Sequence, residues 1–224
     1  MSAIFWAAVT LSVYLLSRQL HRRFAAWWSS PILLTWVVCG VLILSFHASY
    51  QEYLGGTGWI AALIGPATVA FAIPVHQNRS LIRRHWPLLA IGTLAGSVIA
   101  IASSWLLARI FNLSPELQAS LLPRSITTPF AMTVSKDLGG LPELTAAFTA
   151  VTGIFGATIG EGLLAFLPFR SSFARGAFLG MGAHGAGVAK ARELGEEEGA
   201  VAGLIMVFAG LLNVLGGVFL IPLF

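Results

Sequence analysis

One segment of the chain, residues 122–136, places a positive charge and several hydroxyl groups between and beside two prolines in an apolar stretch. Pro123 and Pro129 lack the backbone N–H that a helix uses, and each disfavours helical geometry at the preceding residue. Backbone amides and carbonyls near them are therefore expected to lack helical partners. The polar side chains of this stretch are Arg124, Ser125, Thr127 and Thr128.

These groups are suited to binding a small anion. Unpaired backbone groups persist at membrane depth only where they are buried in protein or line a water-filled cavity. Hydroxyls, amide N–H groups and a guanidinium together match a carboxylate. We therefore predict that this stretch binds an anionic substrate. In the alternative interpretation, Arg124 extends to the membrane surface and the hydroxyls bond to their own helix.

A second broken stretch, residues 63–75, has the same pattern without a charge. Gly65, Pro66 and Pro74 interrupt an apolar segment around Thr68. Thr68 is therefore a further candidate for substrate binding. A kinked helix with a purely structural role is the alternative.

Glu161 is an acid within an apolar segment, where a carboxylate is costly unless it is paired, protonated or hydrated. It is a candidate for proton or cation coupling, and its natural partners would be Arg124 or His184. Alternatively, it lies at the end of its span as an interfacial acid.

His184 lies in the glycine-rich stretch Gly180–Gly187, between Gly182 and Gly185. The stretch contains GxGxxG, but a dinucleotide site needs a preceding strand, and none is expected here. Glycines let a helix unwind and let backbones approach closely. His184 is a candidate for both substrate binding and proton coupling, with a structural histidine as the alternative. In the charged run that follows, residues 190–199, the Glu residues are expected to be solvated and to need no further role.

The composition places these segments in a membrane. Of the 224 residues, 57% are hydrophobic and only 10% are charged, too few to coat a soluble globule. We predict an all-α polytopic membrane protein with a single domain, residues 1–224, and seven to eight helical segments, some broken or re-entrant. The expected spans are 2–17, 32–46, 59–77, 87–110, 121–136, 142–167, 174–190 and 199–223.

Several functional classes are excluded by the pattern. The net charge of +4 comes from short clusters between apolar segments, which indicate membrane topology rather than nucleic-acid binding. The one cysteine, Cys39, and the absence of CxxC or HExxH runs predict neither a metal nor a cofactor. No Ser/His or paired-carboxylate arrangement predicts an enzyme.

The positive clusters near residues 18–23 and 79–84 place the N-terminus outside and both loops inside. Beyond residue 110 two topologies remain: segments 121–136 and 174–190 either both cross or both re-enter and leave on the same side. A weak match of residues 68–75 to 127–134, with Gly96 opposite Gly156, suggests an internal repeat of unknown orientation.

As an ordered set, several motifs resemble those of the LrgB/CidB family of bacterial membrane proteins. They are GPATVA at 65–70, PRSITTPFAM at 123–132, GGLPELTA at 139–146, GIFGA at 153–157, ARGA at 174–177, AHGAG at 183–187 and EGA at 198–200. Two departures are Arg124, where many members carry Lys, and Phe130, where a smaller aliphatic residue is expected.

The resemblance implies a multi-pass protein of the bacterial cytoplasmic membrane, in contact with lipid. It implies either a transporter of small carboxylates such as glycolate, glycerate, pyruvate or lactate, coupled to protons, or a holin- or antiholin-like regulator of murein hydrolase export and lysis that forms oligomeric pores. It also implies a small LrgA/CidA-like membrane partner and a homo- or hetero-oligomer.

Overall fold

A computed structural model describes residues 3–24 and 29–217, with the side chains of residues 3, 67 and 68 excepted. Every regular element in these ranges is helical, which confirms the all-α prediction. The chain divides into two compact units, Met1–Ala67 and Thr68–Phe224. The boundary falls within α4 (Ile64–Ala70), and each unit is described by itself.

The first unit contains α1 (Ala3–Phe24), α2 (Pro31–Ser45) and α3 (Tyr50–Ala62). Trp6 is fully buried at its centre, with its ring 5.5 Å from that of Tyr53 and 6.4 Å from that of Phe46. These edge-on contacts join all three segments. Aromatic packing therefore holds this unit together.

The expected span 59–77 is divided among three helices. α3 ends at Ala62, α4 follows, and α5 covers Ala72–Gln77. Gly65 and Pro66 lie in the first turn of α4, and Pro74 lies within α5. The interruption predicted at residues 65–74 thus produces short helices rather than one continuous span.

Three helices of the described chain are long and apolar enough to cross a membrane: α6 (Arg79–Ile110), α9 (Pro142–Phe166) and α11 (Glu196–Gly216). At about 1.5 Å per residue, α9 is about 37 Å long, enough for a bilayer core of about 30 Å. α6 bends at His85, where φ is −121° and ψ is 18°. Pro87 explains the bend, because it removes a backbone donor two residues later.

The segment between α6 and α9 folds back on itself. It consists of α7 (Pro115–Leu121), the 3-10 turn η2 (Leu122–Ser125) and α8 (Thr128–Asp137). The Thr145 hydroxyl oxygen lies 3.0 Å from the Ser120 carbonyl oxygen and 2.6 Å from the Ser135 hydroxyl oxygen, so α7 and α8 meet at one point of α9. We call residues 115–137 hairpin 1, with its tip at residues 122–128.

The second fold-back lies within α10 (Ser172–Leu194), which breaks at His184 (φ 37°, ψ −118°). Its two arms, 172–183 and 185–194, pack together, since Gly187 lies against the carbonyl oxygen of Leu179. Residues 175 and 192, one from each arm, both reach the start of α11 at residues 198–199. We call residues 172–194 hairpin 2, with its tip at His184.

The two hairpins open toward opposite ends of α9. Hairpin 1 leads directly into the start of α9, and hairpin 2 follows directly from its end. A long helix followed by a hairpin therefore occurs twice, as α6 with hairpin 1 and α9 with hairpin 2. The sequence match of 68–75 to 127–134 pairs the segments that precede α6 and α9, so it agrees in order with a correspondence of these two helices.

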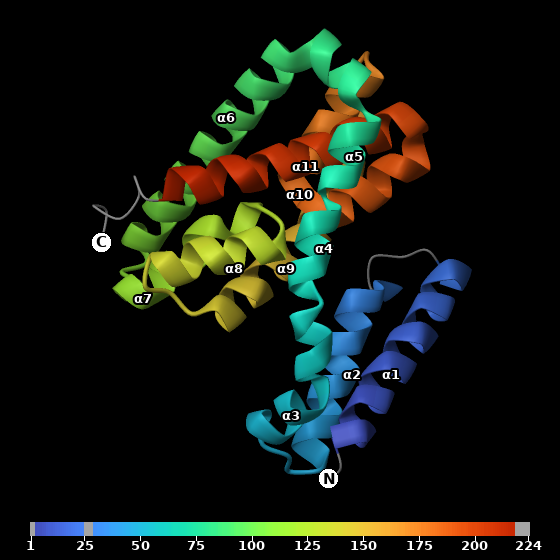
Figure 1. Cartoon of the computed structure of the whole chain (residues 1–224), viewed down its shortest axis with the longest axis vertical. Helices are drawn as coiled ribbons and strands as arrows, with labels where there is room; N and C mark the ends of the chain where they lie inside the picture. Colours follow the sequence, from blue (N-terminus) through green and yellow to red (C-terminus); the bar gives the residue numbers. More distant parts are fainter. Residues whose placement is uncertain (1–2, 25–28, 218–224) are drawn as a thin grey trace. The chain divides into compact units, whose positions relative to one another are not determined.

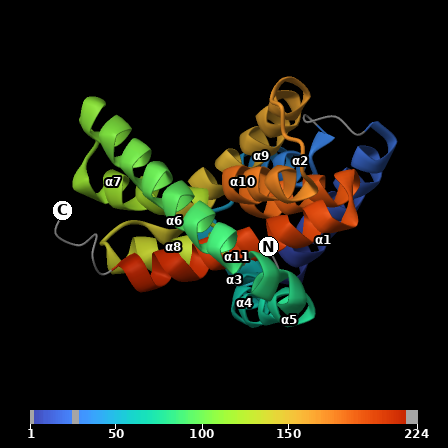
Figure 2. The same cartoon turned by 90° about the horizontal axis from the view of Figure 1, so that it is seen from above.

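α11 connects the two hairpins along its length. Near its start, a Cβ at Gly180 of hairpin 2 would stand 2.5 Å from the Ala202 carbonyl oxygen. Near its end, Gly210 lies against the ring of Phe130 in hairpin 1. Two perpendicular views show the end of α11 beside α8 (Figures 1 and 2). Buried aliphatic side chains of α11, including Val201, Leu204 and Ile205, form the core of this unit.

The fold-backs agree with the second of the two topologies left open by charge, in which segments 121–136 and 174–190 re-enter and leave on the same side. If both hairpins leave the membrane on the side where they enter, Arg170, Arg175, Lys190 and Arg192 share the positive side, and Lys136 lies opposite.

We predict that cysteines at the two ends of one hairpin are labelled from the same side. In a Cys39→Ala background, Phe111→Cys and Asp137→Cys should react with an impermeant maleimide from one side. Arg170→Cys and Glu196→Cys should react only from the other side. Labelling of positions 111 and 137 from opposite sides would show that hairpin 1 crosses the membrane.

Candidate functional site

The tip of hairpin 1 is the place where helical hydrogen bonding stops. Ile126 is extended (φ −113°, ψ 168°), and so is Thr127, the residue that precedes α8 (φ −64°, ψ 142°). Pro129 stands at the start of α8, where its missing N–H costs nothing. The N-terminal end of α8 and the C-terminal end of η2 therefore meet at this tip, with dipoles of opposite sign.

The tip of hairpin 2 is held by a buried histidine. His184 is 6% exposed, and its Nε2 lies 3.0 Å from the carbonyl oxygen of Thr149 in α9. A carbonyl only accepts, so Nε2–H is the donor. The left-handed backbone at His184 is unusual for a residue other than glycine. Gly182 and Gly185, the predicted helix-breaking residues, flank it, and the break falls on the histidine itself.

Both tips meet the middle of α9. Arg124 Nη1 donates to Thr152 Oγ1 over 3.5 Å, and the imidazole of His184 packs against Gly153. A Cβ at Gly153 would stand 2.7 Å from His184 Cε1. The structure thus brings the predicted residues Arg124 and His184 to adjacent positions of one helix, although 60 positions separate them in the sequence (184 minus 124).

Arg124 has no acidic partner in the part of the chain that the structure describes. The ion pairs there are Arg175 with Glu198, and Lys190 with both Glu161 and Glu193. A half-buried guanidinium held only by one long hydrogen bond keeps most of its donors available. This tip can therefore attract an anion, and the bidentate geometry of a guanidinium suits a carboxylate.

Glu161 pairs with Lys190 at 2.8 Å, rather than with Arg124 or His184 as expected. Its side chain is 58% exposed in the structure. The expectation was wrong because sequence could not show that the second arm of hairpin 2 runs back along α9. Glu161 therefore lies apart from the tips.

The remaining predicted residues divide between two sides of the tip of hairpin 1. Ser125 faces a crevice formed with α6 and α11, whereas Arg124 points to α9. Thr127 is buried, and Thr128 opens α8 half-buried. Thr68 lies in α4, and its side chain is outside the described residues.

Glu198 was expected to be solvated, but it is one of the best-buried charges. It is 5% exposed, and its Oε1 accepts from Arg175 Nη2 at 2.6 Å and from Nε at 3.2 Å. This bidentate pair joins the first arm of hairpin 2 to α11. A charge run between spans looks solvated in sequence, and only the fold-back brings residue 175 to it.

Sequence reasoning also missed Thr149, Thr152 and Asn213. The two threonines line one face of α9 with Thr145, at spacings of four and seven residues, which is the signal that could have found them. Asn213 Nδ2 donates to Ser97 Oγ at 2.9 Å and joins α11 to α6. An amide within an apolar helix was the available signal.

The described residues contain no cluster of three or more metal-ligating side chains. What the site offers is a cation, hydroxyls and two opposed helix ends, which are groups that can bind and orient an anion.

We predict that Gly156→Ala disrupts the contact of α9 with hairpin 2. The added methyl would stand 2.5 Å from the carbonyl oxygen of Gly182, a backbone atom that cannot move aside. Overpacking of this kind costs about 1–3 kcal/mol, so the melting temperature in detergent should fall. Gly162→Ala is the matched control, because a Cβ there meets nothing within 4 Å. Equal melting temperatures for the two variants would contradict the packing.

We predict that Glu198→Ala lowers the melting temperature by several degrees. The change leaves Arg175 without its partner at the base of hairpin 2. Glu197→Ala, at an exposed neighbouring position, should have little effect. If both variants melt like the unmodified protein, the ion pair contributes no stability.

Comparison with known proteins places the chain. The sequence profile of the LrgB-like family matches residues 10–223. The uncharacterized protein YwbG of Bacillus subtilis is 36% identical over 95% of both chains. Holin-like protein CidB of Staphylococcus epidermidis is 30% identical over 95% of this chain and 93% of its own length. CidB of Staphylococcus aureus is 30% identical over 94% and 92%, respectively. No solved structure matches the chain. The chain therefore belongs to the LrgB-like family.

Proposed function

We propose that this protein is a holin-like regulator of permeability in the bacterial cytoplasmic membrane. The observation that carries the proposal is the match over nearly the full chain to relatives named holin-like protein CidB. The two hairpins give a physical basis. Each arm is about 15–18 Å long at about 1.5 Å per residue, which is about half the thickness of a bilayer core. The two tips would therefore meet near the middle of the membrane, whereas α6, α9 and α11 are long enough to cross it.

Permeability control of this kind needs assembly. α6 and α9 expose large apolar side chains along their outer faces, among them Ile91, Ile99, Phe155 and Ile159. Such faces contact lipid or further helices. We propose that copies of this chain, together with an LrgA/CidA-like membrane partner, assemble through them, and that the assembly governs murein hydrolase export and lysis.

A second candidate is a transporter of small carboxylates, and the unpaired guanidinium of Arg124 favours it. An intramembrane charge without a protein partner is a functional hypothesis by default. In this proposal the carboxylate binds Arg124 beside Thr152 and the N-terminal end of α8. Substrates of the glycolate, glycerate, pyruvate or lactate type fit this chemistry.

For proton coupling, His184 is better placed than Glu161. His184 lies at the tip of hairpin 2, and its Nδ1 is left to accept a proton while Nε2–H is held by Thr149. Glu161 is exposed and engaged by Lys190. We therefore assign coupling to His184 and give Glu161 the role of fixing the second arm of hairpin 2.

One liposome experiment separates the two functions. Vesicles containing the purified protein, with and without its partner, are loaded with a fluorescent dye and tested for uptake of labelled glycolate or pyruvate under a pH gradient. A holin-like assembly should release dye and small solutes without saturation. A transporter should retain the dye and accumulate the carboxylate, at a rate that saturates as the carboxylate concentration rises.

We predict that Arg124→Gln abolishes saturable carboxylate uptake, because it removes the only charge at the tips among the described residues. Arg170→Gln, at an exposed position, is the matched control and should transport normally. Dye release unchanged in Arg124→Gln, with no saturable uptake in any variant, would establish the holin-like function alone. If the vesicles neither release dye nor take up a carboxylate, both proposals are wrong.

A further inference from the structure

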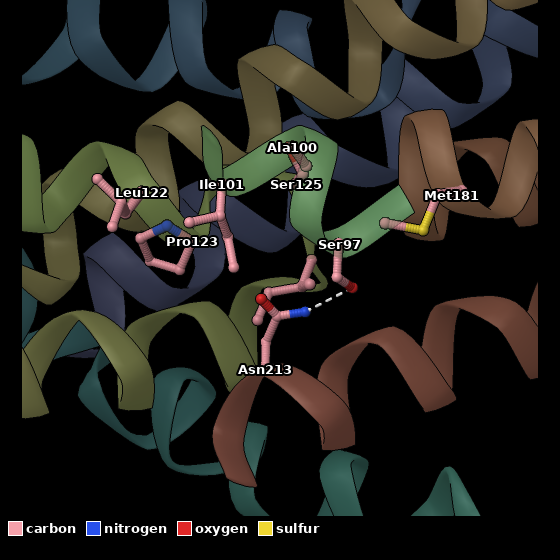
Figure 3. Close-up of a pocket in the computed structure, with 9 residues that line it drawn as sticks. Ser97, Ala100, Ile101, Leu122, Pro123, Ser125, Met181 and Asn213 are labelled. Carbon is pink, nitrogen blue, oxygen red and sulfur yellow. Dashed lines mark hydrogen bonds between the residues drawn. The ribbon is translucent and has the colours of Figure 1, made fainter. Parts of the chain in front are cut away.

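A crevice on the other side of the hairpin 1 tip has a different chemistry from the Arg124 side. It lies among α6, the tip, the first arm of hairpin 2 and α11 (Figure 3). Its polar side chains are Ser97, Ser125 and Asn213, and the other lining residues are apolar or small. No charged side chain of the described chain lines it.

Asn213 presents an acceptor to this crevice. Its Nδ2 donates to Ser97 Oγ at 2.9 Å and to the Ala209 carbonyl oxygen at 2.8 Å, which uses both amide hydrogens. Because a carbonyl can only accept, the second bond fixes which atom is nitrogen. The amide oxygen, which points away from Ser97 in Figure 3, has no partner among the described residues. Asn213 is 5% exposed, so this oxygen has little access to solvent.

The tip of hairpin 1 adds further oxygens. The Ser125 hydroxyl makes no hydrogen bond within the described chain and lines the same crevice. In a continuous helix the Ser125 carbonyl would accept from residue 129, but Pro129 has no N–H. The C-terminal end of η2 also carries the negative end of a helix dipole. Unwound carbonyls and helix C-terminal ends of this kind coordinate monovalent cations in membrane proteins.

We propose that this crevice binds a dehydrated monovalent cation of the Na⁺ class, through Asn213 Oδ1, the hydroxyl of Ser125 and carbonyl oxygens of the tip. The space holds no position wide enough for a water molecule, so an organic ligand is excluded. Mg²⁺ and Ca²⁺ are disfavoured, since their protein sites usually include carboxylate ligands and no carboxylate lines the crevice. The site does not depend on which of the two functions holds.

The test is thermal unfolding of the full-length protein in detergent while NaCl replaces choline chloride at constant ionic strength. The chloride concentration then stays fixed, so chloride binding at Arg124 cannot change the melting temperature and be mistaken for cation binding. The melting temperature should rise to a plateau with Na⁺, and K⁺ should give a smaller rise. A melting temperature that is the same in NaCl, KCl and choline chloride would overturn the proposal.

Three variants locate the site. Ser125→Ala removes an oxygen without breaking any hydrogen bond of the described structure, and should raise the half-saturating Na⁺ concentration about tenfold or more. Asn213→Ala should do the same, with a lower melting temperature in choline because the bond to Ser97 is lost. Ser104→Ala is the control: Ser104 is a buried serine of α6 that does not line the crevice, and its hydroxyl donates to the carbonyl oxygen of Ala100 in its own helix. Wild-type Na⁺ dependence in both Ser125→Ala and Asn213→Ala would refute the site.

Discussion

Two breaks in helical structure must be satisfied by the same stretch of α9, and the rest of the second unit is arranged around this constraint. A buried polar group without a partner costs about 1–3 kcal/mol, and no water is available at membrane depth. The carbonyl oxygen of Thr149 accepts a hydrogen bond from His184, and the hydroxyl of Thr152 accepts one from Arg124. Gly153 and Gly156 leave the space that this approach requires. A bulkier face of α9 would keep His184 away from the carbonyl oxygen of Thr149, and a wholly apolar face would leave Arg124 without the Thr152 hydroxyl.

The two hairpins are attached differently. Hairpin 1 is joined to α9 by buried hydroxyls, in which Thr145 contacts both Ser120 and Ser135, and by an apolar cluster around Leu122 and Phe130. Hairpin 2 packs through glycines and through an apolar cluster in which Leu179 and Val188 meet Met206 of α11, and ion pairs to α9 and α11 join its base. In the re-entrant topology its charges also lie on the positive side of the protein.

Much of this arrangement could be predicted from local sequence. Prolines at 123 and 129 and the glycines around His184 correctly marked both tips, because backbone chemistry acts within a few residues. The expected spans 87–110 and 142–167 match α6 and α9 closely, since hydropathy reports length. Hydropathy does not distinguish a crossing from a fold-back, so the sequence alone could not show that segments 121–136 and 174–190 form hairpins. The pairing of Glu161 with Lys190, and of Glu198 with Arg175, depends on that fold-back and could not be deduced.

Two adjacent residues at the tip of hairpin 1, Arg124 and Ser125, favour ligands of opposite charge. Arg124 turns toward α9, while Ser125 turns toward α6 and α11, so ligands of opposite sign are favoured on the two sides of one turn. An unpaired guanidinium would repel a cation in the crevice, and an anion bound to it would remove that repulsion. Binding on either side should then favour binding on the other, since coupling between two sites is reciprocal. One break in the backbone can favour both a cation and an anion, because the carbonyl end of η2 and the amide end of α8 meet there.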